Sequence, residues 1–149
     1  MEVSDDYSQC IPRPKDPLGN YKSVSYSNGI GKISGQFPIS KEGILITGKF
    51  GKEVSSAQMD TVASYVALNI LAHLNALNDT IELLSLIHID CYVQSVLNDQ
   101  HLISLVNQVS SVLTTALGVT GEHSRSLVIV SDLPFNAMME VVTTFSYKT

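Results

Sequence analysis

The stretch that decides the fold is HSRSLVIVSDLPFNAMMEVVTTFSY, residues 123–147. It holds two apolar segments on either side of a Leu-Pro-Phe-Asn turn, and this pattern predicts two β-strands, either a hairpin or neighbours in one sheet. The first segment opens with Arg125, and the second carries Glu140 between two hydrophobic residues. Because buried charges are costly unless they are paired or functional, these two residues are the first candidates for a site.

The alternation around Glu140 predicts which way its side chain points. A strand has a period of two residues, so Glu140 shares one face with Val142 and Thr144. The opposite face carries the larger hydrophobic residues Met139, Val141, Phe145 and Tyr147. One face therefore belongs to a core and the other to a mixed cleft. The spacing alone leaves open whether Arg125 and Glu140 have a function or form a structural ion pair.

Segments before this stretch predict further strands and an N-terminal arm. Residues 21–39 alternate around Asn28-Gly29, which is typical of a β-hairpin. Residues 43–51 form a short apolar segment bounded by glycines and predict another strand. Residues 1–16 are polar and proline-containing and predict an extended arm. We therefore assign a single domain to residues 17–149.

Two helices and a buried strand complete the chain. Residues 55–77 repeat apolar side chains at three- and four-residue spacing, with Ser55 and Gln58 as a possible capping box. Residues 81–95 predict a buried strand, and residues 99–117 predict a second amphipathic helix. The order favours an α+β sandwich in which two helices cover one face of a mixed sheet. The other face lacks helices, and only 15% of residues are charged, so we expect self-association.

Composition argues against several classes of function. The net charge is −5 and no Lys/Arg cluster is present, so nucleic acid is not an expected partner. No membrane-spanning run or secretion signal is evident and the two cysteines are far apart, which favours a cytoplasmic protein without a membrane partner. The four histidines lack metal-ligand spacing and no nucleotide-binding loop is found, so we expect neither a metal nor another cofactor.

The motif SRSLVIVSDLPFNAMMEVV resembles the signature of the RidA/YjgF family, also called L-PSP or translation-initiation-inhibitor proteins. That signature has an Arg-Ser opening, a short apolar run, Leu-Pro, and a Glu six residues after the Pro. Arg125, Leu133, Pro134 and Glu140 fall in register with it.

Upstream residues extend this resemblance to about residues 17–147. Tyr21 and the turn Ser34-Gly35-Gln36 match the amino-terminal hairpin of the family, and Asn107 lies where a helix asparagine is often found. The segment TGKFGKEVSSAQ is similar to a longer RidA-like subgroup. The resemblance implies a chorismate-mutase-like fold and a homotrimer, with the sheets forming an inner β-barrel and the ligand sites in the clefts between subunits.

The resemblance also implies a reaction, the cofactor-free hydrolysis of reactive 2-imino or enamino acids to 2-keto acids and ammonia. Arg125 would grip the carboxylate through paired hydrogen bonds and Glu140 would activate water. Tyr21, Ser34, Gly35 and Asn107 would complete the substrate-binding site. Leu127 stands where many members have a cysteine, and it would make the pocket more apolar, which favours larger substrate side chains.

Two other functions remain as alternatives. The first is a non-catalytic module that binds a small carboxylate metabolite such as a 2-keto acid, with Glu140 as a wall of the pocket. The second is the RNA cleavage suggested by one of the family names, which the acidic composition disfavours.

Overall fold

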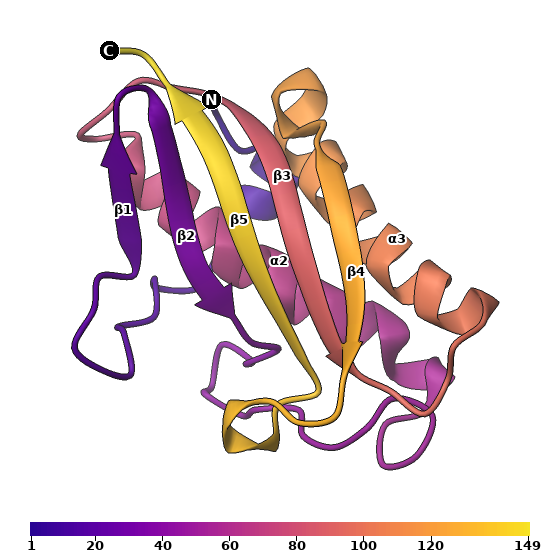
Figure 1. Cartoon of the computed structure of the whole chain (residues 1–149). Coiled ribbons are helices and arrows are strands. Elements are labelled where there is room, and N and C mark those ends of the chain that lie inside the picture. Colours follow the sequence, from indigo (N-terminus) through magenta and orange to yellow (C-terminus); the bar gives the residue numbers. More distant parts are fainter.

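The computed structural model describes residues 1–149 and contains one mixed five-stranded sheet in the order β1-β2-β5-β3-β4. Two long helices, α2 and α3, cover one face of this sheet (Figure 1). The elements are α1 (Asp5–Ser8), β1 (Val24–Ser27), β2 (Ile30–Gln36), α2 (Met59–Leu77), β3 (Leu83–Gln94), α3 (Gln100–Leu117), β4 (Ser124–Val130) and β5 (Met139–Tyr147). The predicted α+β class, with two helices on one face of a mixed sheet, is confirmed.

The amino-terminal hairpin forms as its sequence predicts. β1 and β2 pair antiparallel, and Ser27 is aligned with Ile30 across a two-residue turn. The turn residues Asn28 and Gly29 have φ angles of 52° and 82°. Asparagine and glycine adopt this left-handed conformation at low cost, and the resulting turn matches the twist of the two strands.

The predicted pairing of the last two strands is wrong, because β3 lies between β4 and β5. β3 connects to β4 through α3, and a helical crossover places the two strands side by side and parallel. β5 then fills the space between β2 and β3 and pairs antiparallel with both. The connection from β4 to β5 contains a short 3-10 turn, Pro134–Asn136, and crosses the end of the sheet.

Residues 43–51 do not form the predicted strand. Only single bridges occur there, including Thr47 with Ala137 and Phe50 with Ser95. Gly43, Gly48 and Gly51 all have positive φ angles, and this repeated reversal of the backbone is incompatible with an extended strand. The segment is instead a loop that runs along the end of the sheet (Figure 1).

The first residues are more ordered than an extended arm. Asp5–Ser8 forms one helical turn, and the amino terminus of Met1 donates a hydrogen bond of 3.1 Å to the Leu83 carbonyl. The Ser4 amide donates to the Ala116 carbonyl at 2.8 Å. These contacts hold the arm against the start of β3 and the last turn of α3.

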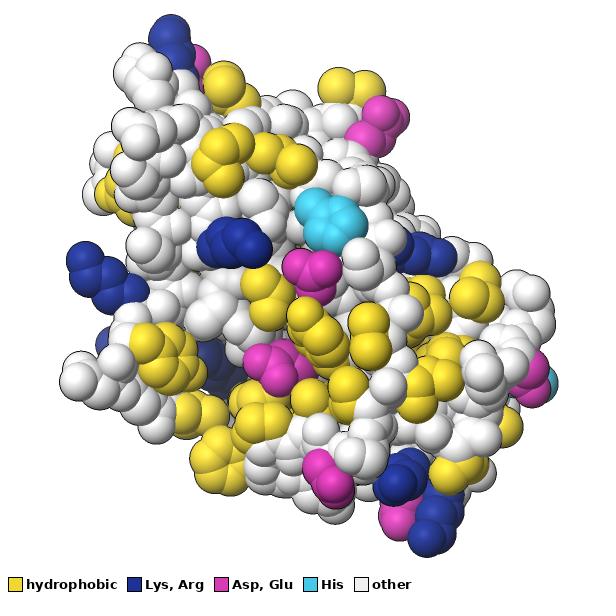
Figure 2. All heavy atoms as spheres, in the orientation of Figure 1, with side chains coloured by type: hydrophobic (Ala, Val, Ile, Leu, Met, Phe, Trp, Pro, Cys, Tyr) yellow, Lys and Arg dark blue, Asp and Glu magenta, His cyan; other side chains and the backbone are white.

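The two faces of the sheet have different surroundings. The face under α2 and α3 carries the core, and Met139, Val141 and Phe145 of β5 are fully buried there, as the alternation predicts. The opposite face has no helix over it, and hydrophobic side chains gather across it together with a histidine and acidic side chains (Figure 2). This open face contains the exposed Val128 of β4.

Helix α3 with its 3-10 extension, Gln100–Gly121, is long and apolar enough to cross a membrane by composition alone. Its hydrophobic stripe is buried against α2 and the sheet, including Leu105, Val109 and Leu113 at 0% exposure. This stripe of α3 is therefore part of the hydrophobic core.

Candidate functional site

Arg125, at the start of β4, points toward α3 and is held by three hydrogen bonds. Its Nη1 donates to the Val106 carbonyl at 3.2 Å and to the Ser110 hydroxyl at 3.0 Å. Its Nη2 donates to Oδ1 of Asn107 at 2.6 Å. A guanidinium group has five N–H donors, so two remain for a ligand. The half-buried cation is thus oriented before any ligand arrives.

Ser110 connects Arg125 to a histidine that the sequence analysis did not select. The Ser110 hydroxyl lies 2.9 Å from Nε2 of His123, and Nδ1 of His123 lies 2.6 Å from the Gly121 carbonyl. Because a carbonyl can only accept, Nδ1 carries the proton and Nε2 accepts from Ser110. Ser110 follows Asn107 by three residues, a spacing that places two side chains on one face of a helix. The position of Ser110 beside Asn107 could have been found from this spacing.

Leu127 lies two residues beyond Arg125 on the same face of β4 and is aligned with Cys91 of β3. A thiol, that of Cys91, therefore lies beside Leu127 on the neighbouring strand. Burial raises the pKa of Cys91 to about 12, although Arg125 opposes this shift. A fully buried thiol with this pKa is protonated at neutral pH and does not act as a nucleophile or base.

The second group of predicted residues lies around Glu140. Tyr21, Ser34, Gly35 and Glu140 line a cavity of about 250 Å³. The remaining walls are hydrophobic and come from Leu18, Phe37, Pro134 and Phe135. Four of the seven predicted site residues therefore share one pocket, although they come from three separate parts of the chain.

The Glu140 carboxyl group is half-buried in this pocket, and burial raises its pKa. No hydrogen bond or nearby cation offsets that effect. A side chain at Gly35 would overlap the Glu140 carboxyl group and displace it, so the glycine leaves room for the carboxyl group in its present position. The pairing of β2 with β5 shifts register between Ile33 and Gln36, and such irregularities often lie beside functional sites.

Phe135 closes one side of the pocket from a strained turn. Its φ angle is 58° and its neighbour Asn136 has φ 57°, although neither is glycine. A non-glycine residue in this conformation costs on the order of 1–3 kcal/mol and persists only where its surroundings hold it. Asn136 provides this support, since its side chain accepts from Gln94 at 3.1 Å and its carbonyl accepts from Gly48 at 2.9 Å.

A single chain does not bring Arg125 and Glu140 together. Arg125 is aligned with Ile89 of β3, which is aligned with Thr143 of β5, so all three point to the helix-covered face. Glu140 precedes Thr143 by three residues and points to the open face. The structural alternative of an Arg125–Glu140 ion pair within one chain is therefore wrong. The predicted residues form an arginine half, with Asn107 and Leu127, and a glutamate half.

Comparison with known proteins identifies relatives over nearly the whole chain. No family model matches the sequence. Protein TCP17 of Trypanosoma cruzi is 27% identical over 133 residues, which cover 88% of this chain and 83% of that protein. The crystal structure of Atu1372 from Agrobacterium tumefaciens, of unknown function, has a TM-score of 0.80 at 29% identity and covers 90% of this chain and 87% of that one.

Structures at lower sequence identity share the same fold. The YjgF gene product of E. coli has a TM-score of 0.67 at 18% identity, and the match covers 93% of this chain and 98% of that one. Other structures of this group carry provisional descriptions as an endoribonuclease or a translation initiation inhibitor, and E. coli TdcF was solved with bound serine.

Proposed function

The chain has the fold of the RidA/YjgF proteins, and on this premise we propose that it is a cofactor-free deaminase of reactive 2-imino acids. It hydrolyses these compounds, or their enamine tautomers, to 2-keto acids and ammonia in the cytoplasm. The observation that carries the proposal is the Glu140 carboxyl group, which is partly desolvated, has a raised pKa and shares a pocket with Tyr21, Ser34 and several hydrophobic side chains. Burial of this kind favours the protonated form of a carboxyl group and is common among groups that exchange protons in catalysis.

The arginine half and the glutamate half form one cleft between two subunits of a homotrimer. The open face of the sheet and the exposed Ile103, Val128 and Ile129 near the free edge of β4 supply apolar surface for this association. A head-to-tail arrangement places Arg125 of one subunit opposite Glu140 of the next and repeats the cleft three times around the ring.

In this cleft the substrate carboxylate binds the two free donors of Arg125, which fixes the position of the imine carbon. A water oxygen then bonds to that carbon. Glu140 takes a proton from the water and passes it to the nitrogen, which receives the C=N π electrons. In the second step Glu140 moves the hydroxyl proton to nitrogen, the C–N bond breaks, and ammonia leaves. One water is consumed and Glu140 returns to its starting state.

The test is ammonia and 2-keto acid release from 2-aminoacrylate and 2-iminobutanoate, generated in situ by a pyridoxal-phosphate-dependent dehydratase. We expect the protein to release ammonia and 2-keto acid faster than buffer alone does. Arg125→Ala should abolish this acceleration. If several imines are hydrolysed no faster than in buffer, the proposal is wrong.

A second candidate is a module that binds a small carboxylate without turnover. The observation that favours it is the fixed guanidinium of Arg125, which needs only a carboxylate as partner. Bound serine in E. coli TdcF, a protein of the same fold, shows that this fold accepts an amino acid. Calorimetric binding of 2-ketobutyrate without hydrolysis of any imine would favour this candidate.

RNA cleavage is disfavoured by the net charge of −5 and by the lack of a Lys/Arg cluster in the sequence. An RNA-degradation assay with purified Arg125→Ala as the control tests it.

A further inference from the structure

A second cavity, of about 290 Å³, adjoins the Glu140 pocket beneath the segment Lys15–Ser23. The two cavities share a common set of lining residues, namely Leu18, Tyr21, Ser34, Gly35 and Phe37. The two cavities therefore lie next to each other, with the Glu140 carboxyl group lining the first and the segment Lys15–Ser23 covering the second. Nothing in the proposed hydrolysis uses the second cavity.

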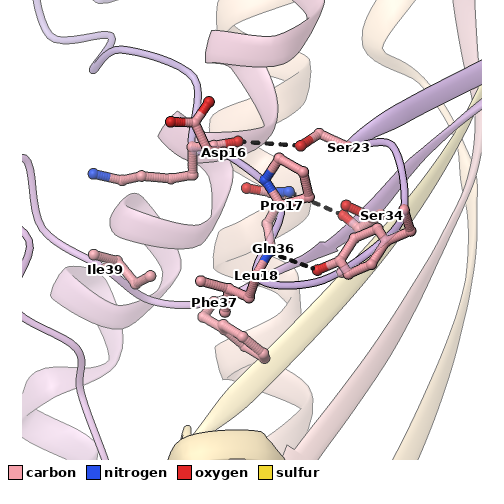
Figure 3. Close-up of a pocket in the computed structure, with 11 residues that line it drawn as sticks. Asp16, Pro17, Leu18, Ser23, Ser34, Gln36, Phe37 and Ile39 are labelled. Carbon is pink, nitrogen blue, oxygen red and sulfur yellow. Dashed lines mark hydrogen bonds between the residues drawn. The ribbon is translucent and has the colours of Figure 1, made fainter.

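The walls of the second cavity are mainly hydrophobic. Pro17 and Leu18 lie on one side of it, with Phe37 and Ile39 among the labelled residues that complete the wall (Figure 3). Lys15 and Asp16 are its only charged lining residues and have opposite signs, so the cavity has no net charge to attract a charged group.

Three of the six polar side chains around the cavity already have partners within the protein. Ser23 donates to the Lys15 carbonyl at 3.2 Å, and Nε2 of Gln36 donates to the Ser34 carbonyl at 3.0 Å. The Tyr21 hydroxyl accepts from the Leu18 amide at 3.3 Å (Figure 3). A polar ligand group would find few free partners there, whereas an apolar group would meet hydrophobic walls.

The far wall is held in place by the core. Asn69 of α2 is buried, and its Nδ2 donates to the carbonyl groups of Phe37 and Ile39 at 3.2 and 3.0 Å. These bonds fix the backbone of the wall without any ligand. The cavity is therefore preformed, and a ligand group entering it does not have to order this segment.

We propose that this cavity receives the substrate side chain, and that the preferred substrates are 2-imino acids with long apolar side chains, such as those derived from leucine, methionine or phenylalanine. This inference rests on the proposed function. With the carboxylate at Arg125 and the imine carbon at Glu140, the side chain is the substrate group left to extend toward the adjacent cavity. A methyl group would leave most of the volume to water, since one water occupies about 30 Å³ of liquid.

A substrate series on the wild-type protein tests the proposal without any variant. An amino-acid oxidase generates imines in situ from leucine, methionine, phenylalanine, alanine and glutamate, and keto acid release is followed above the buffer rate. We expect kcat/KM for the leucine-derived imine to exceed that for the alanine-derived imine about tenfold or more, the discrimination typical of an apolar pocket. Equal or higher values for the alanine- or glutamate-derived imine would overturn the proposal.

Ile39→Trp fills the cavity, and Ile44→Trp places the same side chain at a position that is 68% exposed and lines none of these cavities. We expect Ile39→Trp to lower kcat/KM for the leucine-derived imine about tenfold, with less than a threefold change for the alanine-derived imine. Ile44→Trp should change neither. An equal loss for both imines in a folded Ile39→Trp protein would contradict the proposal.

Failure of this inference can be told apart from failure of the proposed function. If only small imines are hydrolysed, the deaminase function stands and the cavity assignment falls. If no imine is hydrolysed, the deaminase function and the preference for long apolar substrates are both wrong. Calorimetry with 4-methyl-2-oxopentanoate and pyruvate then shows whether the cavity selects long apolar carboxylates.

Discussion

The arginine half and the glutamate half of the proposed site are built in opposite ways. Arg125 lies between a strand and a long helix, and hydrogen bonds to Val106, Asn107 and Ser110 fix its guanidinium. Glu140 faces a pocket formed by a loop, an irregular strand pairing and a strained turn, and no bonded partner offsets the rise in its pKa. A satisfied charge is suited to hold a ligand, and an unsatisfied carboxyl group is suited to exchange a proton.

Glu140→Gln tests this division of roles most strongly. Glutamine keeps the size of the side chain but cannot take up a proton, so we expect kcat to fall about 10²–10⁴-fold. Binding of 2-ketobutyrate, measured by calorimetry, should change less than threefold. If Glu140→Gln weakens binding as much as it slows turnover, the carboxyl group is a binding residue and the contrast between the halves is lost.

Gly35→Ala tests whether the carboxyl group needs its close contact with β2. The added methyl group would occupy the space of the carboxyl group and displace it. We expect kcat to fall about 10- to 100-fold, the usual result of misplacing a catalytic group by about 1 Å. Gly43→Ala is the control for a general loss of stability, because the φ angle of 89° at Gly43 strains any side chain while the added methyl group contacts nothing and lies outside both halves. Unchanged kcat in Gly35→Ala would show that the carboxyl position is not critical.

Ser110→Ala tests the fixed orientation of Arg125. It removes one of three hydrogen bonds from the guanidinium and the link to His123. A hydrogen bond to a charged group contributes about 1.5–3 kcal/mol, so we expect KM to rise about tenfold or more and kcat to stay within twofold. Ser111→Ala, on the exposed side of α3, is the matched control. A fall in kcat without a change in KM would place Ser110 in the chemistry instead.

The smallest expected effect concerns stability. Burial lowers the pKa of His73 on α2, and its Nε2 has no partner. Below about pH 6.5 the unfolded chain therefore binds more protons than the folded one, and stability falls as the pH decreases through this range. We expect His73→Leu to reduce the fall in Tm between pH 7.5 and 5.5, and the exposed His101→Leu to leave it unchanged. An equal pH dependence in all three proteins would exclude His73 as a cause.

The sequence predicted the local features of the fold well. The Asn28-Gly29 turn, the two helical stripes and the alternation that buries Met139 and Val141 all depend on residues close in sequence. The resemblance to the RidA/YjgF family is confirmed at the level of the fold by the solved structures. It also brought together Tyr21, Ser34, Gly35 and Glu140, which periodicity alone could not have connected.

The relation between distant strands was harder to predict. The Leu-Pro-Phe-Asn turn suggested that β4 and β5 are neighbours. The crossover through α3 instead places β4 beside β3, and the two strands run parallel. The face to which Arg125 points depends on this pairing, so its separation from Glu140 could not be obtained from either strand alone. Residues 43–51 showed an apolar pattern, while the conformation of their glycines decided against a strand.

Mixing two inactive chains tests most directly whether the halves meet between subunits. Arg125→Ala and Glu140→Ala are each expected to be inactive alone, because every cleft then lacks one essential group. Refolding or co-expressing them in equal amounts yields mixed rings in which about a quarter of the clefts combine an intact Arg125 with an intact Glu140. We predict recovery of about a quarter of wild-type kcat per chain. Mixed assemblies, verified by mass spectrometry, that remain inactive would contradict the proposed intersubunit site.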